Sequence, residues 1–211
     1  MQFSQSALYA YCEAHSAPPS ELLCALERET HLKTLAPQMM SGRLQGGFLR
    51  MLSGLLRPRQ VLEIGTFTGY GALCLAEGLA PDGVLHTIEA NPEMEYIIRK
   101  YIRLAGKEAS VQLHIGQAQE VIPTLPGLFD LVYIDAGKQD YATFFHLVVD
   151  RVSPGGLLLA DNVLWGGKIL DAVPDVDTRI MQAFNQLLAS DPRVETLVLP
   201  LRDGLTIARK K

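Results

Sequence analysis

The sequence predicts an α/β protein: a mostly parallel sheet with helices on both faces, a helical extension before it and an antiparallel hairpin after it. From Val61 onward, short apolar runs alternate with amphipathic segments of helix length, which is typical of parallel strands joined by crossover helices. Only residues 201–204 separate the last two apolar runs, which is too short for a helix and predicts a hairpin. The first 60 residues show helical periodicity instead.

The expected elements follow in order from these patterns. The N-terminal helices cover 5–15, 21–35 and 43–56, the first two being separated by a break at Pro18 and Pro19. Strands are expected at 61–64, 84–89, 111–115, 128–135, 156–160, 194–200 and 205–208. Helices are expected between them at 71–79, 92–105, 118–122, 141–152 and 177–190.

Length and composition predict one folded domain over 1–211. A chain of 211 residues with 48% apolar and 20% charged residues can form one hydrophobic core and is too apolar for a disordered protein. Residues 1–58 form the expected helical extension and 59–211 the α/β core. No repeat or low-complexity linker suggests a second domain.

The sequence favours a cytoplasmic protein that does not span a membrane. Its N-terminus lacks a basic cluster followed by an apolar run, and no stretch reaches about 18 uninterrupted apolar residues. The three cysteines, Cys12, Cys24 and Cys74, form no CxxC pair, so we expect reduced thiols.

Charge argues against a general nucleic-acid binder, because phosphate contacts favour basic domains and the formal charge is −4. Local clusters still leave RNA open as a minority alternative. These are Arg43, Arg50, Arg57 and Arg59; Arg99, Lys100 and Arg103; and Arg209, Lys210 and Lys211.

A candidate nucleoside site begins where the strand at 61–64 enters a glycine-rich turn and then a helix. A ligand can approach such a backbone closely, as it can at Gly65 and Gly71. Phe67 occupies the second glycine position of the dinucleotide fingerprint, where a side chain would block a pyrophosphate, so NAD is disfavoured. Glu89 ends the second strand and is placed to accept both hydrogen bonds from a ribose diol.

A candidate metal site lies at the ends of two later strands. Asp135, Asp161 and Asn162 are all oxygen donors, which suits a hard cation such as Mg²⁺, or Mn²⁺ or Ca²⁺, and not zinc. Because carboxyl ends of parallel strands share one edge of a sheet, we expect these donors to lie beside the nucleoside site. None of the five histidines has ligand spacing with another, and we interpret all of them as structural or surface residues.

Three motifs resemble those of the caffeoyl-CoA and catechol O-methyltransferase family. They are 63–70 (EIGTFTGY), 134–138 (IDAGK) and 161–165 (DNVLW), and the likeness extends to Gly155-Gly156 and to 199–205 (LPLRDGL). The resemblance covers nearly the whole chain and implies a Rossmann-like class I methyltransferase fold with seven strands. It also implies S-adenosylmethionine (SAM) as the methyl donor and a homodimer, as relatives commonly form.

Matched residue by residue, the resemblance assigns further roles. Glu63 and Gly65 lie by the methionine portion of SAM, with Ser41 making a backbone contact to that end. Tyr70 lies beside the cofactor, Glu89 on the ribose, and Ala118 and Gln119 near the adenine. The expected cofactor-binding set is therefore Ser41, Glu63, Gly65, Tyr70, Gly71, Glu89, Ala118 and Asp135.

The resemblance likewise assigns the metal triad to Asp135, Asp161 and Asn162, and the general base to Lys138. Binding both hydroxyls of a catechol to the metal would stabilise the phenolate, since a phenol has a pKa of about 10. Relatives often have an aspartate where Gly137 stands, a departure that leaves the triad intact. Tyr141 and Trp165 are expected either in an aromatic wall of the substrate pocket or in the core.

The resulting hypothesis is a SAM- and metal-dependent O-methyltransferase that acts on a catechol-like phenolic small molecule. The main alternative is methylation of a hydroxylated uridine in tRNA, which some bacterial relatives carry out. Metal-dependent phosphoester hydrolysis could use the same acidic residues but would leave Glu89 unexplained. A non-catalytic cofactor-binding protein would leave Lys138 and the triad without a use.

Overall fold

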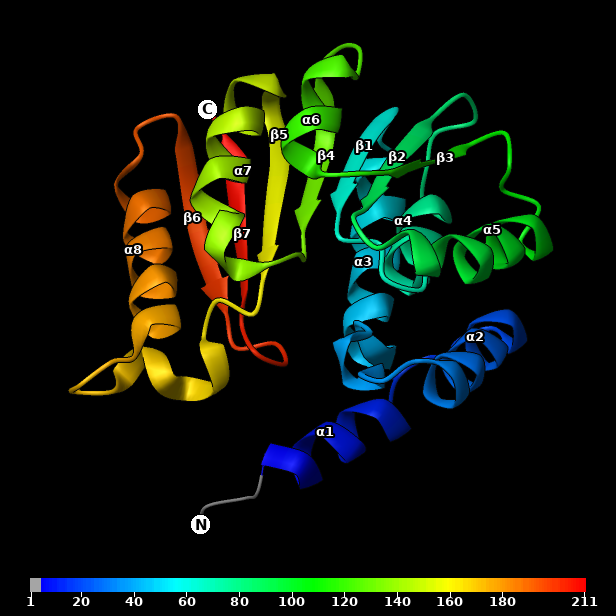
Figure 1. The fold of residues 1–211 in the computed structure, drawn as a ribbon, viewed down its shortest axis with the longest axis horizontal. Coiled ribbons are helices and arrows are strands. Elements are labelled where there is room, and N and C mark those ends of the chain that lie inside the picture. The colour runs from blue at the N-terminus through cyan, green and yellow to red at the C-terminus, as the bar shows by residue number, and fades with distance from the viewer. Residues whose placement is uncertain (1–4) are drawn as a thin grey trace.

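The computed structural model describes residues 5–211 and shows one seven-stranded sheet between two layers of helices (Figure 1). The strand order is β3-β2-β1-β4-β5-β7-β6, with β1 to β5 parallel and β7 antiparallel to both of its neighbours. This confirms the expected fold class and C-terminal hairpin. The strands are β1 Gln60–Ile64, β2 Val84–Glu89, β3 Val111–Ile115, β4 Phe129–Ile134, β5 Val152–Asp161, β6 Val194–Leu199 and β7 Leu205–Lys210.

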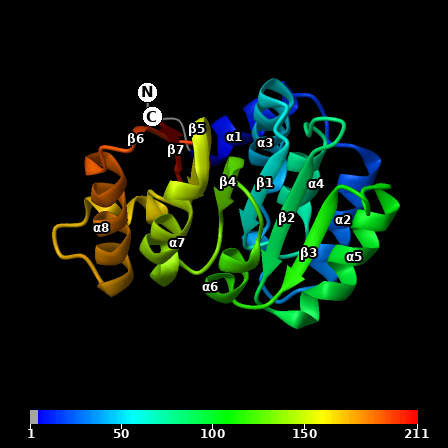
Figure 2. The ribbon, with the colours of Figure 1, turned by 90° about the horizontal axis from the view of Figure 1, so that it is seen from above.

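Helices cover both faces of the sheet, as the view from above shows (Figure 2). On one face lie α6, α7 and α8, and on the other α3, α4 and α5. Their bounds, with those of the two N-terminal helices, are α1 Gln5–Ala14, α2 Glu21–Lys33, α3 Gly42–Leu56, α4 Tyr70–Ala76, α5 Glu95–Leu104, α6 Ala118–Val121, α7 Tyr141–Val148 and α8 Val176–Ser190.

The start of β5 differs most from the expected bounds. The helix expected to reach residue 152 ends at Val148, and β5 begins at Val152 rather than 156. Val152 pairs with Phe129, but the register then shifts before Leu131 pairs with Leu157. Gly155 adopts a φ of 80° within this irregular stretch, so the extra residues bulge out of the ladder. The sequence prediction relied on a continuous apolar run, and residues 152–155 (VSPG) do not form one.

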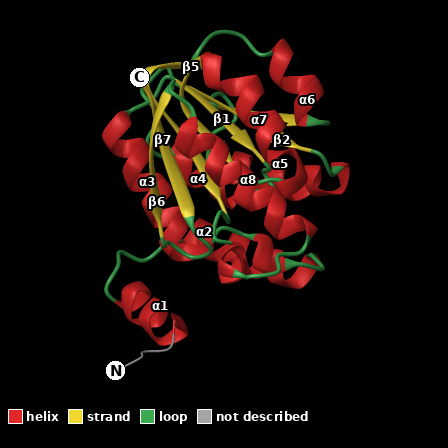
Figure 3. Ribbon diagram, turned by 90° about the vertical axis from the view of Figure 1, so that its left-hand side faces the viewer, coloured by secondary structure: helices red, strands yellow, loops and turns green. Residues whose placement is uncertain are grey.

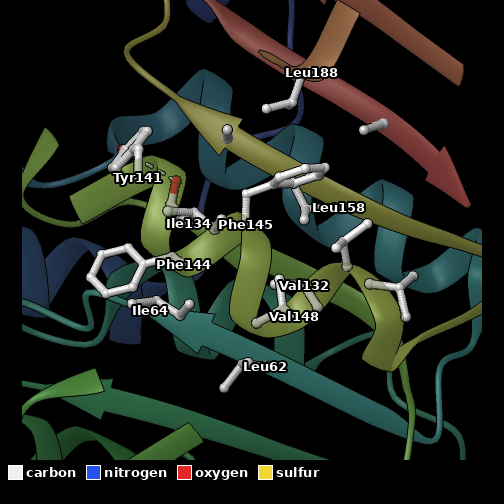
Figure 4. Packing of buried hydrophobic residues seen from close by; sticks show 14 of the residues in the cluster. Leu62, Ile64, Val132, Ile134, Tyr141, Phe144, Phe145, Val148, Leu158 and Leu188 are labelled. Atoms are coloured by element: carbon white, nitrogen blue, oxygen red, sulfur yellow. Dashed lines mark hydrogen bonds between the residues drawn. The ribbon is translucent and has the colours of Figure 1, made fainter. Parts of the chain in front are cut away.

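Alternating strand residues build two separate cores. Leu62 and Ile64 of β1 point toward α7, where Phe144, Phe145 and neighbouring apolar side chains cover them (Figure 4). Val61 points to the opposite face, into the cluster that α3, α4 and α5 complete. A strand buried on both faces is expected for a parallel sheet, and it fixes the direction in which each strand end points.

The N-terminal helices lie near the carboxyl edge of the parallel strands, and α1 projects from the body beyond that edge (Figure 3). Glu29 of α2 accepts hydrogen bonds from Lys100 Nζ (2.5 Å) and Tyr101 Oη (2.9 Å) of α5. Thr30 of α2 donates to Thr68 (2.9 Å) in the glycine-rich turn. The helical extension is thus fastened to the edge where a ligand would bind. Nothing helical within 5–211 is both long and apolar enough to cross a membrane.

The contact between α3 and the end of α4 predicts that alanine substitution has opposite effects on the free energy of unfolding at Gly78 and at Gly47. A Cβ at Gly78 would collide with backbone atoms of Ser53 and Gly54, whereas one at Gly47 would meet nothing within 4 Å. We expect Gly78→Ala to lower the free energy of unfolding by about 1–3 kcal/mol through overpacking. The matched Gly47→Ala should raise it by about 0.5–1 kcal/mol, because alanine favours a helix interior. Urea denaturation measures both, and equal effects would contradict this packing.

Candidate functional site

A cavity of about 610 Å³ opens at the carboxyl edge of the sheet, where the chain order reverses between β1 and β4. It is lined by every residue expected to bind cofactor and also by Lys138 and Asn162. Asp161 is the exception among the expected site residues, since it lies behind the cavity wall with 1% of its surface exposed. The structure therefore brings the predicted nucleoside and metal sites together in one place.

Gly65 allows the ends of β1 and β4 to meet. It has a φ of 98°, and a Cβ there would overlap the backbone carbonyl of Asp135. The Asp135 amide donates to Ile64 O (2.9 Å), which holds the two strand ends together. A Cβ at Gly71 would lie 2.5 Å from Glu63 Oε1, so this glycine makes room for a buried carboxylate. Any side chain at either position would disturb the cavity wall.

Glu89 is held in a fixed orientation at the end of β2. Its Oε2 accepts from the Phe67 amide (2.7 Å) and its Oε1 from the Asn91 amide (2.8 Å). Burial raises the pKa of Glu89, and these backbone hydrogen bonds oppose the rise. Each carboxylate oxygen has further lone pairs, so the group can still accept hydrogen bonds from a diol in the cavity.

Glu63 is, like Asp161, almost fully buried, with 1% of its surface exposed. Its Oε2 accepts from Thr87 Oγ1 (2.5 Å), which lies 2.5 Å from Thr66 Oγ1. Burial raises the pKa of Glu63 to about 8, and the hydrogen bond from Thr87 only partly offsets this. A carboxyl group in this environment gains from any cationic group brought into the cavity.

Lys138 is surrounded by the oxygen atoms of the predicted metal site. It belongs to the short 3-10 helix η4 (Lys138–Asp140), which follows Asp135 and precedes α7. Its Nζ lies 2.5 Å from Asn162 Oδ1, 2.8 Å from Tyr141 Oη and 3.5 Å from Asp135 Oδ1. Only 16% of its side chain is exposed. The candidate base therefore lies where the candidate metal donors converge.

Asp161 carries a buried carboxylate with neither oxygen hydrogen-bonded to any described group. Burial, together with the carboxylate of Asp135, raises the pKa of Asp161, while the nearby Gln45 side chain, the Asn162 amide and the charge of Lys138 oppose the rise. An unpaired buried charge is costly, and a bound cation is one of the few ways to compensate for it. Within 5–211, His, Cys, Asp and Glu residues form no group of three suited to a metal ion, so the candidate centre needs the amide of Asn162 as a donor.

The remaining expected residues lie around this centre. Ser41 precedes α3 and Tyr70 opens α4, and both are largely buried where they meet the cavity. Ala118 and Gln119 line its far end, at the start of α6. Gly137 has an ordinary φ of −59° and open space around its Cβ position, so this loop does not require glycine.

The two candidate aromatic residues take different places. Tyr141, the first residue of α7, is fully buried among apolar side chains (Figure 4). Lys138 Nζ contacts both its hydroxyl (2.8 Å) and its ring, 4.8 Å from the ring centroid. Trp165 lines the cavity and also packs on the core beside it. Burial raises the pKa of the Tyr141 phenol well above its usual range, so its hydroxyl stays protonated beside Lys138.

Strained backbone concentrates at this cavity. Five non-glycine residues of the described chain have positive φ, and four of them line it: Phe67, Asn162, Trp165 and Arg202. Such conformations are costly and cluster at functional sites. The sequence alone assigns no binding role to the Phe67 amide or to Arg202, although they lie in the motifs at 63–70 and 199–205. No sequence pattern reveals the backbone hydrogen bond of Phe67. Arg202 could have been noticed, because arginine is an unusual residue in the short hairpin connection at 201–204.

The histidines lie away from the cavity. His86 and His114 meet on adjacent strands with 3.1 Å between His86 Nδ1 and His114 Nε2, a contact that their sequence separation did not suggest. Burial lowers the pKa of both. His15 and His31 bond to backbone carbonyls of their own helices, and His146 is exposed on α7.

Comparison with known proteins agrees with this geometry. A family model described as O-methyltransferase matches residues 13–211. The chain belongs to the O-methyltransferase family. It is 32% identical to caffeoyl-CoA O-methyltransferase 5 of Nicotiana tabacum, over 97% of this chain and 91% of that protein. The family resemblance stated from the three motifs is thereby confirmed.

Solved structures show the same fold for other members of this O-methyltransferase family and related methyltransferases. The SAH-bound methyltransferase PaMTH1 of Podospora anserina superimposes with a TM-score of 0.91 at 30% identity, covering 100% of this chain and 98% of that one. The O-methyltransferase TomG of Streptomyces achromogenes, solved in complex with SAM, gives 0.90 at 29% identity and covers 100% of both chains.

The buried Glu63 predicts a pH dependence of stability. Between pH of about 4.5 and 8, Glu63 is ionised in the unfolded chain but still protonated in the folded one, so the folded state binds more protons and stability falls as pH rises. One such group contributes a slope of up to about 1.4 kcal/mol per pH unit. Glu63→Gln should flatten this dependence, as urea denaturation from pH 5 to 8 measures. Glu93→Gln, at an exposed site, should not; equal slopes in the wild type and Glu63→Gln would refute the assignment.

Proposed function

We propose that the chain is a SAM-dependent, divalent-metal-dependent O-methyltransferase that methylates a hydroxyl of a catechol-like phenolic small molecule. The observation that carries the proposal is the shared cavity, in which the glycine-rich turn and Glu89 face the cluster of Lys138, Asp135 and Asn162. A methyl donor and an acceptor hydroxyl bound there would be neighbours, and positioning of this kind supplies much of the catalysis of group transfer.

SAM would occupy the side of the cavity under the glycine-rich turn and would supply the methyl group. Glu89, held by the Phe67 and Asn91 amides, is oriented to accept from the ribose diol. Glu63, Gly65, Gly71, Ser41, Tyr70, Ala118 and Asp135 complete the proposed binding set. The SAM complex of TomG and the SAH complex of PaMTH1 support this choice of cofactor.

Asp135, Asp161 and Asn162 would hold the metal. They fit a hard cation, because all three offer oxygen and the Asp161 carboxylate lacks a partner within the described chain. Bound there, Mg²⁺, Mn²⁺ or Ca²⁺ would supply a Lewis acid that favours ionisation of a phenol. The caffeoyl group named in the relatives is a catechol, and it supports an acceptor with two adjacent hydroxyls.

Lys138 is proposed as the general base. Its Nζ lies among the oxygen donors, in reach of a hydroxyl bound at them, and Tyr141 and Asn162 fix its position. In its neutral form it would take the proton of the hydroxyl that becomes methylated. General bases of this kind contribute about 10²–10⁴-fold to rate.

The alternatives receive less support. Eight of the cations that suggested RNA each lie within 4 Å of a carboxylate, which reduces the free positive charge of those surfaces; they are Arg43, Arg50, Arg59, Arg99, Lys100, Arg103, Arg209 and Lys210. Phosphoester hydrolysis leaves the orientation of Glu89 unexplained. A binding protein without catalysis leaves the position of Lys138 unexplained.

We further propose a single methyltransferase domain over 1–211, a homodimer and a cytoplasmic location. Exposed apolar side chains on the helical extension, including Leu32, Leu35, Met51 and Leu55, support contact with a second copy. Sedimentation equilibrium would test the dimer. The cytoplasmic location stays a prediction from the cysteine content.

Metal dependence and the role of Asp161 are tested in one assay. Labelled SAM and a catechol panel are incubated with the protein, with Mg²⁺ or with EDTA. We expect transfer only with Mg²⁺, and a loss of at least roughly 100-fold in Asp161→Ala, because the variant lacks a metal donor. Mg²⁺ should also raise the Tm of the wild type but not of the variant. Asp171→Ala, an exposed carboxylate outside the cavity, is the matched control.

The Lys138→Ala variant distinguishes loss of the general base from loss of metal binding. It should lose about 10²–10⁴-fold in kcat while keeping the increase in Tm with Mg²⁺. Loss of that increase would show that Lys138 organises the metal site instead. Transfer that survives EDTA would overturn metal dependence, and transfer to hydroxylated tRNA but to no catechol would overturn the small-phenol proposal.

A further inference from the structure

Arg202 occupies a turn position that does not suit its side chain. It lies in the hairpin between β6 and β7, where the Gly204 amide donates to Leu201 O (2.8 Å) and makes Arg202 the first central residue of a tight turn. Its φ is 51°. Glycine, asparagine or aspartate is favoured at such a position, because other side chains crowd the backbone there. An arginine kept in this conformation suggests a use for its guanidinium group.

The turn is fixed against the proposed acceptor side of the cavity. The Leu164 amide donates to Asp203 O (2.8 Å), the Val163 amide donates to Gly204 O (3.1 Å), and Asp203 Oδ1 accepts from the Gly166 amide. These bonds attach the turn to the segment that follows Asp161 and Asn162. Arg202 and Trp165, which these bonds connect through the chain, both line the cavity.

The charge of Arg202 is not neutralised by the chain. Lys138 and Arg202 are the two cationic residues among the described residues that line the cavity, and Lys138 already contacts Asp135. Arg202 donates to the backbone carbonyl of Gln38 (2.5 Å) and forms no ion pair within 5–211. Its neighbour Asp203 also lines the cavity, but it accepts from the Gly166 amide and forms no ion pair with Arg202 within the described residues. A guanidinium has five N–H donors, so most of its capacity remains for a ligand.

We propose that Arg202 is a specificity-determining residue that binds a carboxylate on the substrate, so that the preferred acceptor is a catechol acid. This rests on the proposed function, since the acid would extend from a catechol bound at Asp135, Asp161 and Asn162. A carboxylate matches the planar fork of arginine in two parallel hydrogen bonds. One unpaired cation suits one negative charge, whereas the several phosphate charges of a nucleotide thioester would call for more cations than this wall offers.

Two measurements test the proposal. The first is kcat/KM for caffeate, its neutral methyl ester and caffeoyl-CoA. The second needs no turnover: titration with 3-phenylpropanoate and its methyl ester, followed by fluorescence of Trp165, the one tryptophan of the chain. We expect the wild type to prefer each acid over its ester by roughly 10- to 100-fold, the range of a charged hydrogen bond.

Three variants separate the contribution of the Arg202 guanidinium group from the contributions of its charge and of the turn conformation. Arg202→Gly also relieves the backbone conformation, so it should fold, and it should bring the acid-to-ester ratio to about 1. Arg202→Lys keeps the positive charge but lacks the planar guanidinium that forms two parallel hydrogen bonds, so it should give an intermediate acid-to-ester ratio. Arg209→Gln removes one positive charge from the same hairpin outside the cavity and should leave the ratio unchanged.

Three results would overturn the proposal: equal binding of acid and ester by the wild type, a ratio that survives in Arg202→Gly, or dependence on Arg202 for caffeoyl-CoA alone. The last result would indicate that Arg202 binds a phosphate of the coenzyme A group. If no catechol is methylated at all, the proposed function fails, but the fluorescence titration still decides whether Arg202 binds a carboxylate.

Discussion

The site depends on the close approach of two strand ends, which only glycine permits. At Gly65 the backbone of Asp135 fills the space that a Cβ would need, and the Asp135 amide bonds to Ile64 O (2.9 Å). This contact places the turn after β1 directly beside the loop after β4. Because the first carries the proposed cofactor contacts and the second carries Asp135 and Lys138, methyl donor and acceptor can share one cavity.

The same convergence of strand ends brings acidic side chains into a region shielded from solvent. Glu63 and Asp161 are each 1% exposed, and burial raises the pKa of both. Thr87 compensates Glu63 in part, while Asp161 has no hydrogen-bond partner among the described groups. Natural proteins tolerate such unpaired groups where function uses them. Binding of the proposed cationic ligands would recover part of the free energy lost in burying these acids.

The sequence contained the fold and the outline of the site, because both follow from local patterns. Alternating apolar runs predicted the sheet, and the rule that ligands bind at carboxyl ends predicted that Glu89, Asp135 and Asn162 would meet. The sequence could not show that Asp161 lies behind the cavity wall, since depth depends on tertiary packing. Nor could it show the register shift before Leu131, which moved the start of β5 by four residues, from 156 to 152.

The charges of the cavity bear on how its two halves would bind the two proposed ligands. Under the glycine-rich turn, Glu89 has no cationic side chain bonded to it, and Glu63 is a buried carboxyl group that a nearby cation would help to ionise. This half would therefore suit a cofactor with positive charge, as the sulfonium of SAM has. The other half holds both cationic side chains, Lys138 beside Asp135 and Asn162 and Arg202 at the wall, together with the carboxylates of Asp140 and Asp203. A phenol that loses a proton beside Lys138 and carries an acid toward Arg202 would complement that half. Opposite charge preferences within one cavity would thus bring donor and acceptor together in a single orientation.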